Sequence, residues 1–286
     1  MTARSPIISP DALFSRLAQP DLRIVDVRWV LGTPGGGRTR YDAGHLPGAV
    51  FLDLDTDLAA PSGPGRHPLP DPEVFRVRLE AVGIGSDDDV VAYDDTSGST
   101  AARLWWMLDD LGHDQVAILD GGVGAWVEAG YPLTTDSPPV RPRGQLGLRD
   151  TWSNVVDRDA VAERLGSMVL LDARATPRYL GEIEPIDRVP GHIPTATSAP
   201  TTGNLGPDGR LLDQATLAAR FHELGADRSD VQVVTSCGSG VTACFTSLAM
   251  RVAGLPDPIL YPGSYSDWTQ SGLEVSVGSE PGEPPG

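Results

Sequence analysis

The sequence predicts an α/β protein with two tandem domains, each a parallel β-sheet flanked by helices. Short apolar, β-branched segments alternate with segments of helical composition, which is the pattern of a parallel sheet covered by helices. Matching motifs recur in the two halves at offsets of 142 to 147 residues, as expected for two copies of one unit. A chain of 286 residues is long enough for two domains, each with its own core.

In the first half, residues 9–17 should form a helix, because Ser9 can cap it and Pro10 suits its first turn. The glycines of Gly32–Arg40 favour a loop, and Asp71 should cap a helix over Pro72–Ala81. The other expected elements are strands at Leu22–Arg28, Asp89–Tyr93 and Val116–Leu119, and helices at Ser99–Leu111 and from Gly121 to Glu128.

Residues 134–149 are rich in Pro, Arg and Gly and lack an apolar period, so we expect them to link domains 1–133 and 150–275. The second domain should hold strands at Val169–Ala173 and Val231–Thr235 and helices at Thr216–Glu223 and Ala243–Ala253. The tail over residues 276–286 contains mainly Gly, Pro, Glu and Ser, which predicts disorder.

The composition excludes several classes of protein. No apolar run approaches the length of a membrane span, and the first residues lack the apolar core of a signal peptide. A net charge of −17 argues against a general affinity for nucleic acid or anionic lipid, so neither is an expected partner. The two cysteines lie seven residues apart and make no disulfide framework, which fits a reducing, cytoplasmic setting.

The stretch from Val231 to Gly254 carries the clearest chemistry. An apolar strand leads into Cys237-Gly-Ser-Gly-Val-Thr242, and a helix follows. Two glycines let such a loop direct successive amide N–H groups into one concavity, which favours a thiolate. The loop lacks the Gly-Lys-Ser/Thr ending of a phosphate-binding P-loop and the arginine that a cysteine-dependent phosphatase needs. The structural alternative is a small buried cysteine beside a Gly-rich turn.

Three motifs resemble those of the rhodanese superfamily. They are Cys237–Ala243, Tyr41–Ala49, and Asp172–Gly181 followed by Gly191–Pro194. The first is similar to the loop of the branch that uses 3-mercaptopyruvate, whereas the thiosulfate branch more often has basic residues after the cysteine. The resemblance extends from about Ile24 to about Trp268 and implies rhodanese-like domains, a persulfide on Cys237, and no cofactor or metal.

The resemblance also implies how a substrate would be bound. Arg178 would hold the donor's carboxylate, a bidentate role that suits a planar guanidinium, and Arg188 is a candidate second arginine. The alternative for Arg178 is an arginine in a surface loop. Arg174 and Asp172 are better explained as a structural ion pair. The remaining predicted substrate-binding residues are Gly238, Gly240, Val241 and Thr242.

A relay of Ser239, a histidine and an aspartate is a further implication of the resemblance. His67 matches the histidine, with a solvent-exposed loop histidine as the alternative. Asp57 is the nearest candidate for the aspartate, and Asp53 and Asp55 compete with it.

The repeat adds a prediction about the first half. An offset of 142 residues from Cys237 leads to Asp95, and a carboxylate cannot carry a persulfide, so the N-terminal copy should be catalytically silent. His45 and His192 occur at equivalent places in both copies, which favours a structural role. Cys244 falls on the helix after the loop and is expected in the core.

The predicted function is a sulfurtransferase that moves a sulfane sulfur from 3-mercaptopyruvate through a Cys237 persulfide. The acceptor would be cyanide or a thiol, such as a reduced thioredoxin-like protein. Two alternatives stay open: a thiosulfate sulfurtransferase, and a persulfide carrier or binding module with little turnover of small donors.

Overall fold

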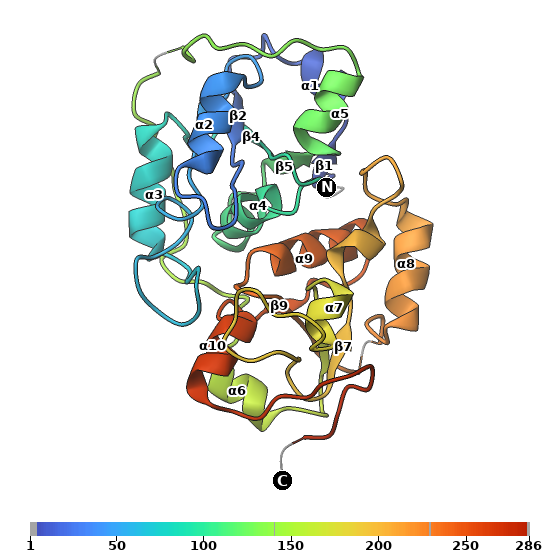
Figure 1. Ribbon diagram of the computed structural model, residues 1–286. Coiled ribbons are helices and arrows are strands. Elements are labelled where there is room, and N and C mark those ends of the chain that lie inside the picture. Colours follow the sequence, from blue (N-terminus) through green and yellow to red (C-terminus); the bar gives the residue numbers. More distant parts are fainter. Residues whose placement is uncertain (1–4, 140, 229, 285–286) are drawn as a thin grey trace. The chain divides into compact units, whose positions relative to one another are not determined.

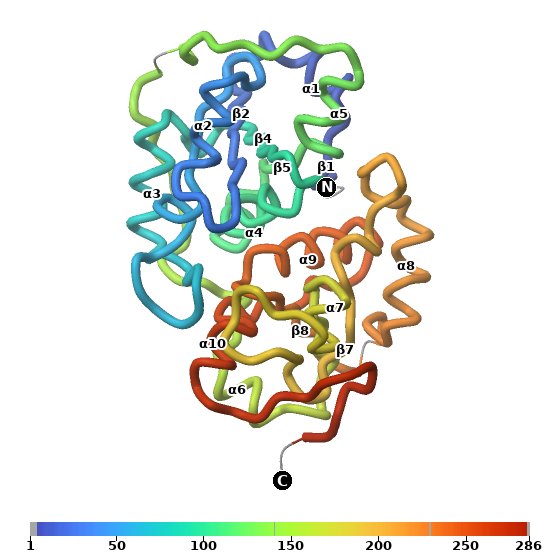
Figure 2. Tube along the Cα trace, in the orientation of Figure 1, coloured from blue at the N-terminus to red at the C-terminus, as the bar shows by residue number. Residues whose placement is uncertain are grey.

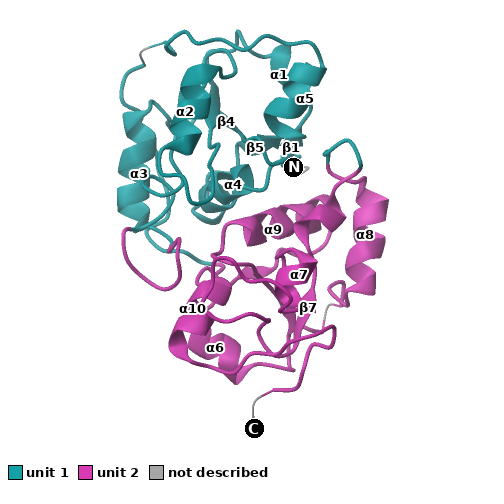
Figure 3. Cartoon of the chain, viewed as in Figure 1, with its two compact units in different colours: residues 1–60, 69–153, 207–210 teal, residues 61–68, 154–206, 211–286 magenta. Residues whose placement is uncertain are grey.

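The computed structural model describes residues 5–139, 141–228 and 230–284, which form two compact units (Figures 1 and 3). Unit 1 comprises the residues up to 60, together with 69–153 and 207–210. Unit 2 comprises 61–68, 154–206 and the residues from 211 onward. The predicted linker 134–149 therefore falls within unit 1, and the short segment 61–68 belongs to unit 2 although unit 1 surrounds it in sequence.

Unit 1 is built on a parallel five-stranded sheet in the order β1-β5-β4-β2-β3. Its strands are β1 (Ile7–Ile8), β2 (Leu22–Asp26), β3 (Val50–Phe51), β4 (Asp89–Tyr93) and β5 (Val116–Leu119). Its helices are α1 (Pro10–Phe14), α2 (Gly36–Ala43), α3 (Pro72–Ala81), α4 (Ala101–Asp110) and α5 (Gly122–Glu128). The predicted caps are present: Ser9 accepts from the Ala12 amide at 3.2 Å, and Asp71 accepts from the Glu73 amide at 2.9 Å.

Helices α1, α2 and α5 cover one face of this sheet. Their core is a cluster of buried apolar side chains from these helices, from β2, β4 and β5, and from the turn after α2, namely Leu13, Leu22, Ile24, Tyr41, Leu46, Ala49, Val91, Tyr93, Leu119 and Trp126. Helix α4, nearly all of whose side chains are buried, packs against β4 and β5. The sheet is thus enclosed by helices, as an alternating β/α sequence predicts.

Unit 2 repeats this plan with a parallel four-stranded sheet in the order β7-β6-β8-β9. Its strands are β6 (Val169–Asp172), β7 (Ala196–Ser198), β8 (Val233–Ser236) and β9 (Ile259–Leu260). Its helices are α6 (Arg158–Glu163), α7 (Thr176–Tyr179), the 3₁₀ helix η1 (Thr201–Asn204), α8 (Gln214–Glu223), α9 (Thr242–Val252) and α10 (Ser264–Ser271).

Two separate cores lie on the two faces of the second sheet. One contains Leu170 with buried side chains of α6, α7 and α10, and the other contains Leu171 with those of α8 and α9. Consecutive residues of β6 therefore point to opposite cores, which is the period of two that a strand requires. Since both faces are covered, the strands are apolar without alternation.

The same ion pair recurs after the matching strands β2 and β6. Arg28 pairs with Asp26 at 2.6 Å and donates to the Gly44 carbonyl at 2.8 Å. Arg174 pairs with Asp172 at 2.6 Å and donates to the Gly191 carbonyl at 2.7 Å. This confirms the α/β fold in two copies and supports the structural role expected for Arg174 with Asp172.

The segment predicted as a Gly-rich loop over Gly32–Arg40 is in fact partly helical, because α2 begins at Gly36. The glycines that lowered its predicted helicity are required by packing: a Cβ on Gly37 would lie 1.8 Å from the Arg28 carbonyl oxygen. Gly35, which precedes the helix, has φ +71°, a left-handed conformation that glycine adopts without strain. Close contact with the backbone after β2 therefore outweighs the low helix propensity.

The C-terminal segment was expected to be disordered, whereas the structure describes it as far as residue 284 and places it along unit 2 (Figure 2). His192 and Ser276 exchange backbone hydrogen bonds of 2.8 and 2.9 Å. Further along, the Thr195 amide donates to the Pro281 carbonyl at 2.6 Å. Residues 285 and 286 lie outside the described part of the chain. No helix among the described residues is long and apolar enough to cross a membrane.

Candidate active site

Cys237 directly follows β8, at the carboxyl end of the second sheet, where α/β folds commonly hold their functional groups. Its side chain is only 2% exposed. The Gly240 amide donates to the Cys237 sulfur at 3.1 Å. An amide donor at this position stabilises negative charge on sulfur. The predicted cradle therefore has one observed amide contact to the sulfur.

Gly240 is the residue that gives the loop this shape. Its φ of +73° is left-handed, and a Cβ there would lie 2.3 Å from the Pro262 carbonyl oxygen. Any other residue would have to move either the loop or the segment that contains Pro262.

The start of α10 holds the loop in place from the other side. Ser264 Oγ accepts from the Cys237 amide at 3.0 Å, and the Tyr265 amide donates to the Cys237 carbonyl at 3.0 Å. The Ser266 amide donates to the Gly238 carbonyl at 2.9 Å. These bonds pair the amide and carbonyl of Cys237 and the carbonyl of Gly238, so three hydrogen bonds fix the loop that holds the nucleophile.

Ser239 and His67 are brought together, as the sequence predicted. His67 Nδ1 lies 2.8 Å from Ser239 Oγ, and each residue is 8% exposed. His67 lies on segment 61–68, which belongs to unit 2 together with the nucleophile loop (Figure 3). A hydroxyl paired with a buried imidazole can pass a proton toward or away from a neighbouring group.

Asp57, predicted as the third member of the relay, belongs to unit 1. Its carboxylate accepts from the Asp53 amide at 2.8 Å. Burial raises the pKa of Asp57, although the Asp53 hydrogen bond opposes this shift. Asp53 in turn accepts from the amides of Asp55 and Thr56, at 2.8 and 3.2 Å. The identity of the relay aspartate thus remains a prediction.

Arg178, on α7, lies next to the nucleophile loop. A Cβ on Gly238 would be 3.4 Å from Arg178 Nη1. The Glu184 carboxylate accepts two hydrogen bonds from the Arg178 guanidinium, from Nε at 3.2 Å and from Nη2 at 2.8 Å. The Glu184 carboxylate also accepts from the Ile186 and Asp187 amides, at 3.0 and 2.9 Å. Burial raises the pKa of Glu184, but the bonds from Arg178 and from the backbone outweigh it and hold the pKa below its usual value.

Arg66 is a site residue that sequence reasoning missed. Its Nη2 would lie 2.8 Å from a Cβ on Gly238, so its guanidinium reaches the same point of the loop as that of Arg178. Its amide donates to Ser266 Oγ at 3.1 Å. The available signal was its place directly before His67, because a segment that delivers the histidine also delivers its neighbour.

Arg188, the second arginine that the resemblance suggested, is not brought to this loop by any described contact. Its side chain is exposed and forms no ion pair with another described residue. Its neighbour Asp187 faces the site instead, and Arg66 occupies the position beside Arg178.

A family model described as the rhodanese-like domain matches residues 9–129 and 157–271. The chain belongs to the rhodanese-like family. The two matched segments confirm the predicted tandem copies, and they correspond to the two sheets described above.

Two relatives and one solved structure match this rhodanese-like chain over more than nine-tenths of both chains. A Pseudomonas aeruginosa protein, provisionally named 3-mercaptopyruvate sulfurtransferase, is 46% identical over 92% of this chain and 94% of its own. A Mycobacterium tuberculosis protein, provisionally named thiosulfate sulfurtransferase, is 37% identical over 94% and 96%. The Escherichia coli structure of SseA, described as a 3-mercaptopyruvate sulfurtransferase of the rhodanese fold, has a TM-score of 0.78 at 31% identity, covering 92% of this chain and all of that one. These names confirm the predicted enzyme class, a sulfurtransferase.

The first rhodanese-like copy has the same loop, between β4 and α4, but with carboxylates in it. Asp94 accepts from four amides of the loop: Thr96 at 2.9 Å, Gly98 at 2.8 Å, Thr100 at 2.6 Å and Ala101 at 2.8 Å. A side chain of the protein thus uses the amides that could otherwise bind an anion.

The offset of 142 residues predicted Asp95 at the position of the nucleophile, but the strand register places Asp94 there, because Tyr93 pairs with Asp26 as Ser236 pairs with Asp172. Asp95, one position further on, is ion-paired with Arg40. Arg40 precedes Tyr41 as Arg178 precedes Tyr179, so this pair joins the counterparts of Gly238 and Arg178. These contacts of the first copy support its predicted silence.

His45 and His192 have the same surroundings in the two copies. Each ring stacks on a tyrosine, Tyr41 or Tyr179, with centroids 3.9 and 3.8 Å apart. His45 Nδ1 lies 2.9 Å from the Tyr41 carbonyl and Nε2 lies 3.0 Å from that of Asp136. These contacts support the structural role expected from the repeat.

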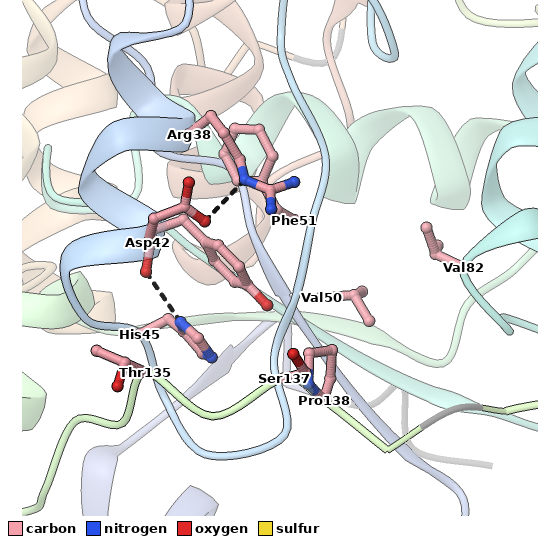
Figure 4. Close-up of a pocket in the computed structure, with 10 residues that line it drawn as sticks. Arg38, Asp42, His45, Val50, Phe51, Val82, Thr135, Ser137 and Pro138 are labelled. Atoms are coloured by element: carbon pink, nitrogen blue, oxygen red, sulfur yellow. Dashed lines mark hydrogen bonds and ion pairs between the residues drawn. The ribbon is translucent and has the colours of Figure 1, made fainter.

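A cavity of about 420 Å³ in unit 1 is lined by His45 and by side chains of α2 and β3 (Figure 4). Both ring nitrogens of His45 already face carbonyl oxygens. Arg38, at its rim, is paired with Asp42 at 2.8 Å. Three polar side chains that line this cavity, Arg38, Asp42 and His45, thus already have partners in the protein.

The remaining predicted residues lie where the sequence placed them. Val241 and Thr242 form the start of α9, with Val241 buried. Cys244 is fully buried one turn further on, and its sulfur lies 3.3 Å from the Gly240 carbonyl. This position agrees with the expected core role of Cys244.

Proposed function

We propose that this chain takes sulfur from 3-mercaptopyruvate and carries it as a persulfide on Cys237. The observation that supports this donor most directly is the placement of positive charge. The loop itself contains no cation, whereas the Arg178 and Arg66 guanidinium groups lie beside Gly238. In mercaptopyruvate the carboxylate is several bonds from the reacting sulfur, so its anchor should lie off the loop.

In the proposed reaction the Cys237 thiolate attacks the thiol sulfur of the donor. A sulfur–sulfur bond forms, the carbon–sulfur bond breaks, and its electron pair leaves with pyruvate as the enolate. The enolate then takes a proton, which the Ser239–His67 pair can deliver. The outer sulfur stays bonded to the Cys237 sulfur, which accepts from the Gly240 amide.

The second half of the cycle needs only a nucleophile. An acceptor thiolate or cyanide attacks the outer sulfur, and the Cys237 thiolate leaves. A reduced thioredoxin-like protein would serve as the thiol acceptor. Cys237 and Cys244 are both free thiols, which supports a reducing, cytoplasmic setting.

Thiosulfate is the second candidate donor, and a specific feature favours it. Two guanidinium groups meet at Gly238, and a compact dianion would also be attracted to them. A persulfide carrier with little turnover of small donors is the candidate outside this class.

Steady-state kinetics with both donors would test the proposal. We expect kcat/KM for mercaptopyruvate to exceed that for thiosulfate by about tenfold or more, roughly the effect of one charge-assisted hydrogen bond. Mass spectrometry should find the added sulfur on the peptide that contains Cys237. A preference for thiosulfate would overturn the donor, and a persulfide with no turnover of either donor would favour the carrier.

A further inference from the structure

A carboxylate of the protein joins the two arginines of the site. Asp187 Oδ1 is ion-paired with Arg66 Nη1, and Asp187 Oδ2 accepts from Arg178 Nη2 at 2.8 Å. The Asp187 side chain is only 3% exposed. Its two oxygens therefore have the partners that the carboxylate of a bound substrate would have between two guanidinium groups.

Arg66 is held rigidly enough to act as a binding group. The hydrogen bond from its backbone amide to Ser266 Oγ fixes its backbone. Gly65, directly before it, has φ +77° and packs so closely that a Cβ there would lie 2.5 Å from the Gly263 carbonyl oxygen. Arg66 Nε is buried and has no hydrogen-bond partner among the described residues. A buried N–H of a charged group is costly to leave unpaired, so Arg66 has a donor available for a ligand oxygen.

The charges at this place are balanced before any substrate enters. Arg66 and Arg178 face the carboxylates of Glu184 and Asp187. The carboxylate of a donor would add a negative charge beside the Glu184 and Asp187 carboxylates, and neighbouring like charges repel one another. One of these two carboxylates has to be displaced before the donor's carboxylate can bind both arginines.

Asp187 accepts fewer hydrogen bonds from the described residues than Glu184 does. Glu184 accepts from two backbone amides as well as from Arg178, whereas the described contacts of the Asp187 carboxylate are to the two arginines alone. Asp187 also lies in the segment 181–190, which contains no helix or strand. Displacing it would break no element of the fold.

We propose that Asp187 is an internal competitor for the donor's carboxylate, and that Arg66 is a second carboxylate-binding residue beside Arg178. Asp187 bridges the two arginines, and the donor's carboxylate takes its place when the donor binds. The identity of the donor rests on the function proposed above, but recognition of a carboxylate does not require sulfur transfer.

The test measures binding without chemistry. Pyruvate, which has the carboxylate but no transferable sulfur, is titrated by calorimetry into the full-length Cys237→Ser protein. Adding Asp187→Asn should tighten pyruvate binding by about tenfold, the lower end of what one charge-assisted hydrogen bond contributes. Adding Arg66→Gln instead should weaken binding by about the same factor.

Two further variants keep the result interpretable. Asp257→Asn removes the same charge from an exposed ion pair with Arg251, and should leave pyruvate binding unchanged. Arg66→Lys keeps the positive charge and should restore part of the affinity lost in Arg66→Gln, which a general defect in folding would not allow.

Changes in pyruvate affinity that differ from these expectations would overturn the proposal. If Asp187→Asn weakens pyruvate binding or leaves it unchanged, Asp187 orients the arginines rather than competing for them. If Arg66→Gln binds pyruvate as well as its parent, Arg66 is no part of the carboxylate site. In the enzyme with Cys237 intact, Asp187→Asn should lower KM for mercaptopyruvate with kcat little changed. A wild type that never forms the persulfide would refute the proposed function and leave these binding results standing.

Discussion

Replacing Glu184 with Gln tests whether this carboxylate positions Arg178. The change keeps the shape but turns one carboxylate oxygen into an NH₂ group, which cannot accept from Arg178 Nε. The wild-type bonds are 3.2 Å to Nε and 2.8 Å to Nη2, around a Glu184 side chain that is 3% exposed. Breaking a buried pair of this kind costs about 3 kcal/mol, which corresponds to a melting temperature about 6–12 °C lower.

The loss should depend on pH in a defined direction. The pKa of Glu184 is lowered in the folded protein, so its contribution to stability is complete above the unfolded value, about 4.3. It is lost as the pH falls through the folded value. Urea unfolding of wild type and Glu184→Gln should therefore differ by a constant amount between about pH 7 and pH 5, and the difference should shrink in more acidic solution.

Activity provides the second measurement for the same variant. A guanidinium without its bidentate partner is free to turn away from Gly238, so KM for mercaptopyruvate should rise about tenfold with kcat little changed. Glu182→Gln, an exposed neighbour, is the matched control and should behave as wild type. Equal stability of Glu184→Gln and wild type at pH 7, or a difference that persists unchanged at acidic pH, would refute this role of Glu184.

Three further predictions concern the loops. Cys237→Ser should abolish sulfur transfer while Cys244→Ser retains it, and a persulfide detected by mass spectrometry on Cys244 would contradict this assignment. Gly240→Ala should lower the melting temperature by several degrees and reduce kcat, because its Cβ would meet the Pro262 carbonyl at 2.3 Å; unchanged values in both measurements would show that the loop tolerates a side chain. Asp95→Ala should keep turnover within a few-fold, and a loss of activity comparable to that of Cys237→Ser would show that the first copy takes part.

Elements with a clear cap or a continuous apolar run could be predicted from the sequence. The helix Pro72–Ala81 was predicted from Asp71, and the strand Asp89–Tyr93 from its apolar run, with the same bounds as the structure has. Helix α2 and short elements such as α7 (Thr176–Tyr179) were not predicted. Their formation depends on packing against distant residues, which a local pattern does not contain.

Some residues of the candidate site could likewise be predicted from the sequence, and others could not. Cys237 and Ser239 could be predicted because one short motif contains them, and His67 because the family resemblance matches it to a relay histidine. Arg66 and Asp187 could not be predicted, because their importance depends on two loops, 121 residues apart in sequence, that meet in the Arg66–Asp187 ion pair. The family resemblance suggested Arg188, which lies one position from Asp187, the residue that faces the site.

The two copies share one fold but place their acidic residues differently. In both, an arginine one residue before the stacked tyrosine pairs with an acid: Arg40 with Asp95, and Arg178 with Asp187. In the first copy the acid stands within the loop, one position after Asp94, which occupies the place of the nucleophile. In the second copy the acid comes from the separate segment 181–190, which leaves the loop position to Cys237. An acid on a segment without regular structure can move away when a substrate arrives, whereas Asp95 is part of its loop. The difference that would make one copy an enzyme is therefore the location of the carboxylate as much as the presence of the cysteine.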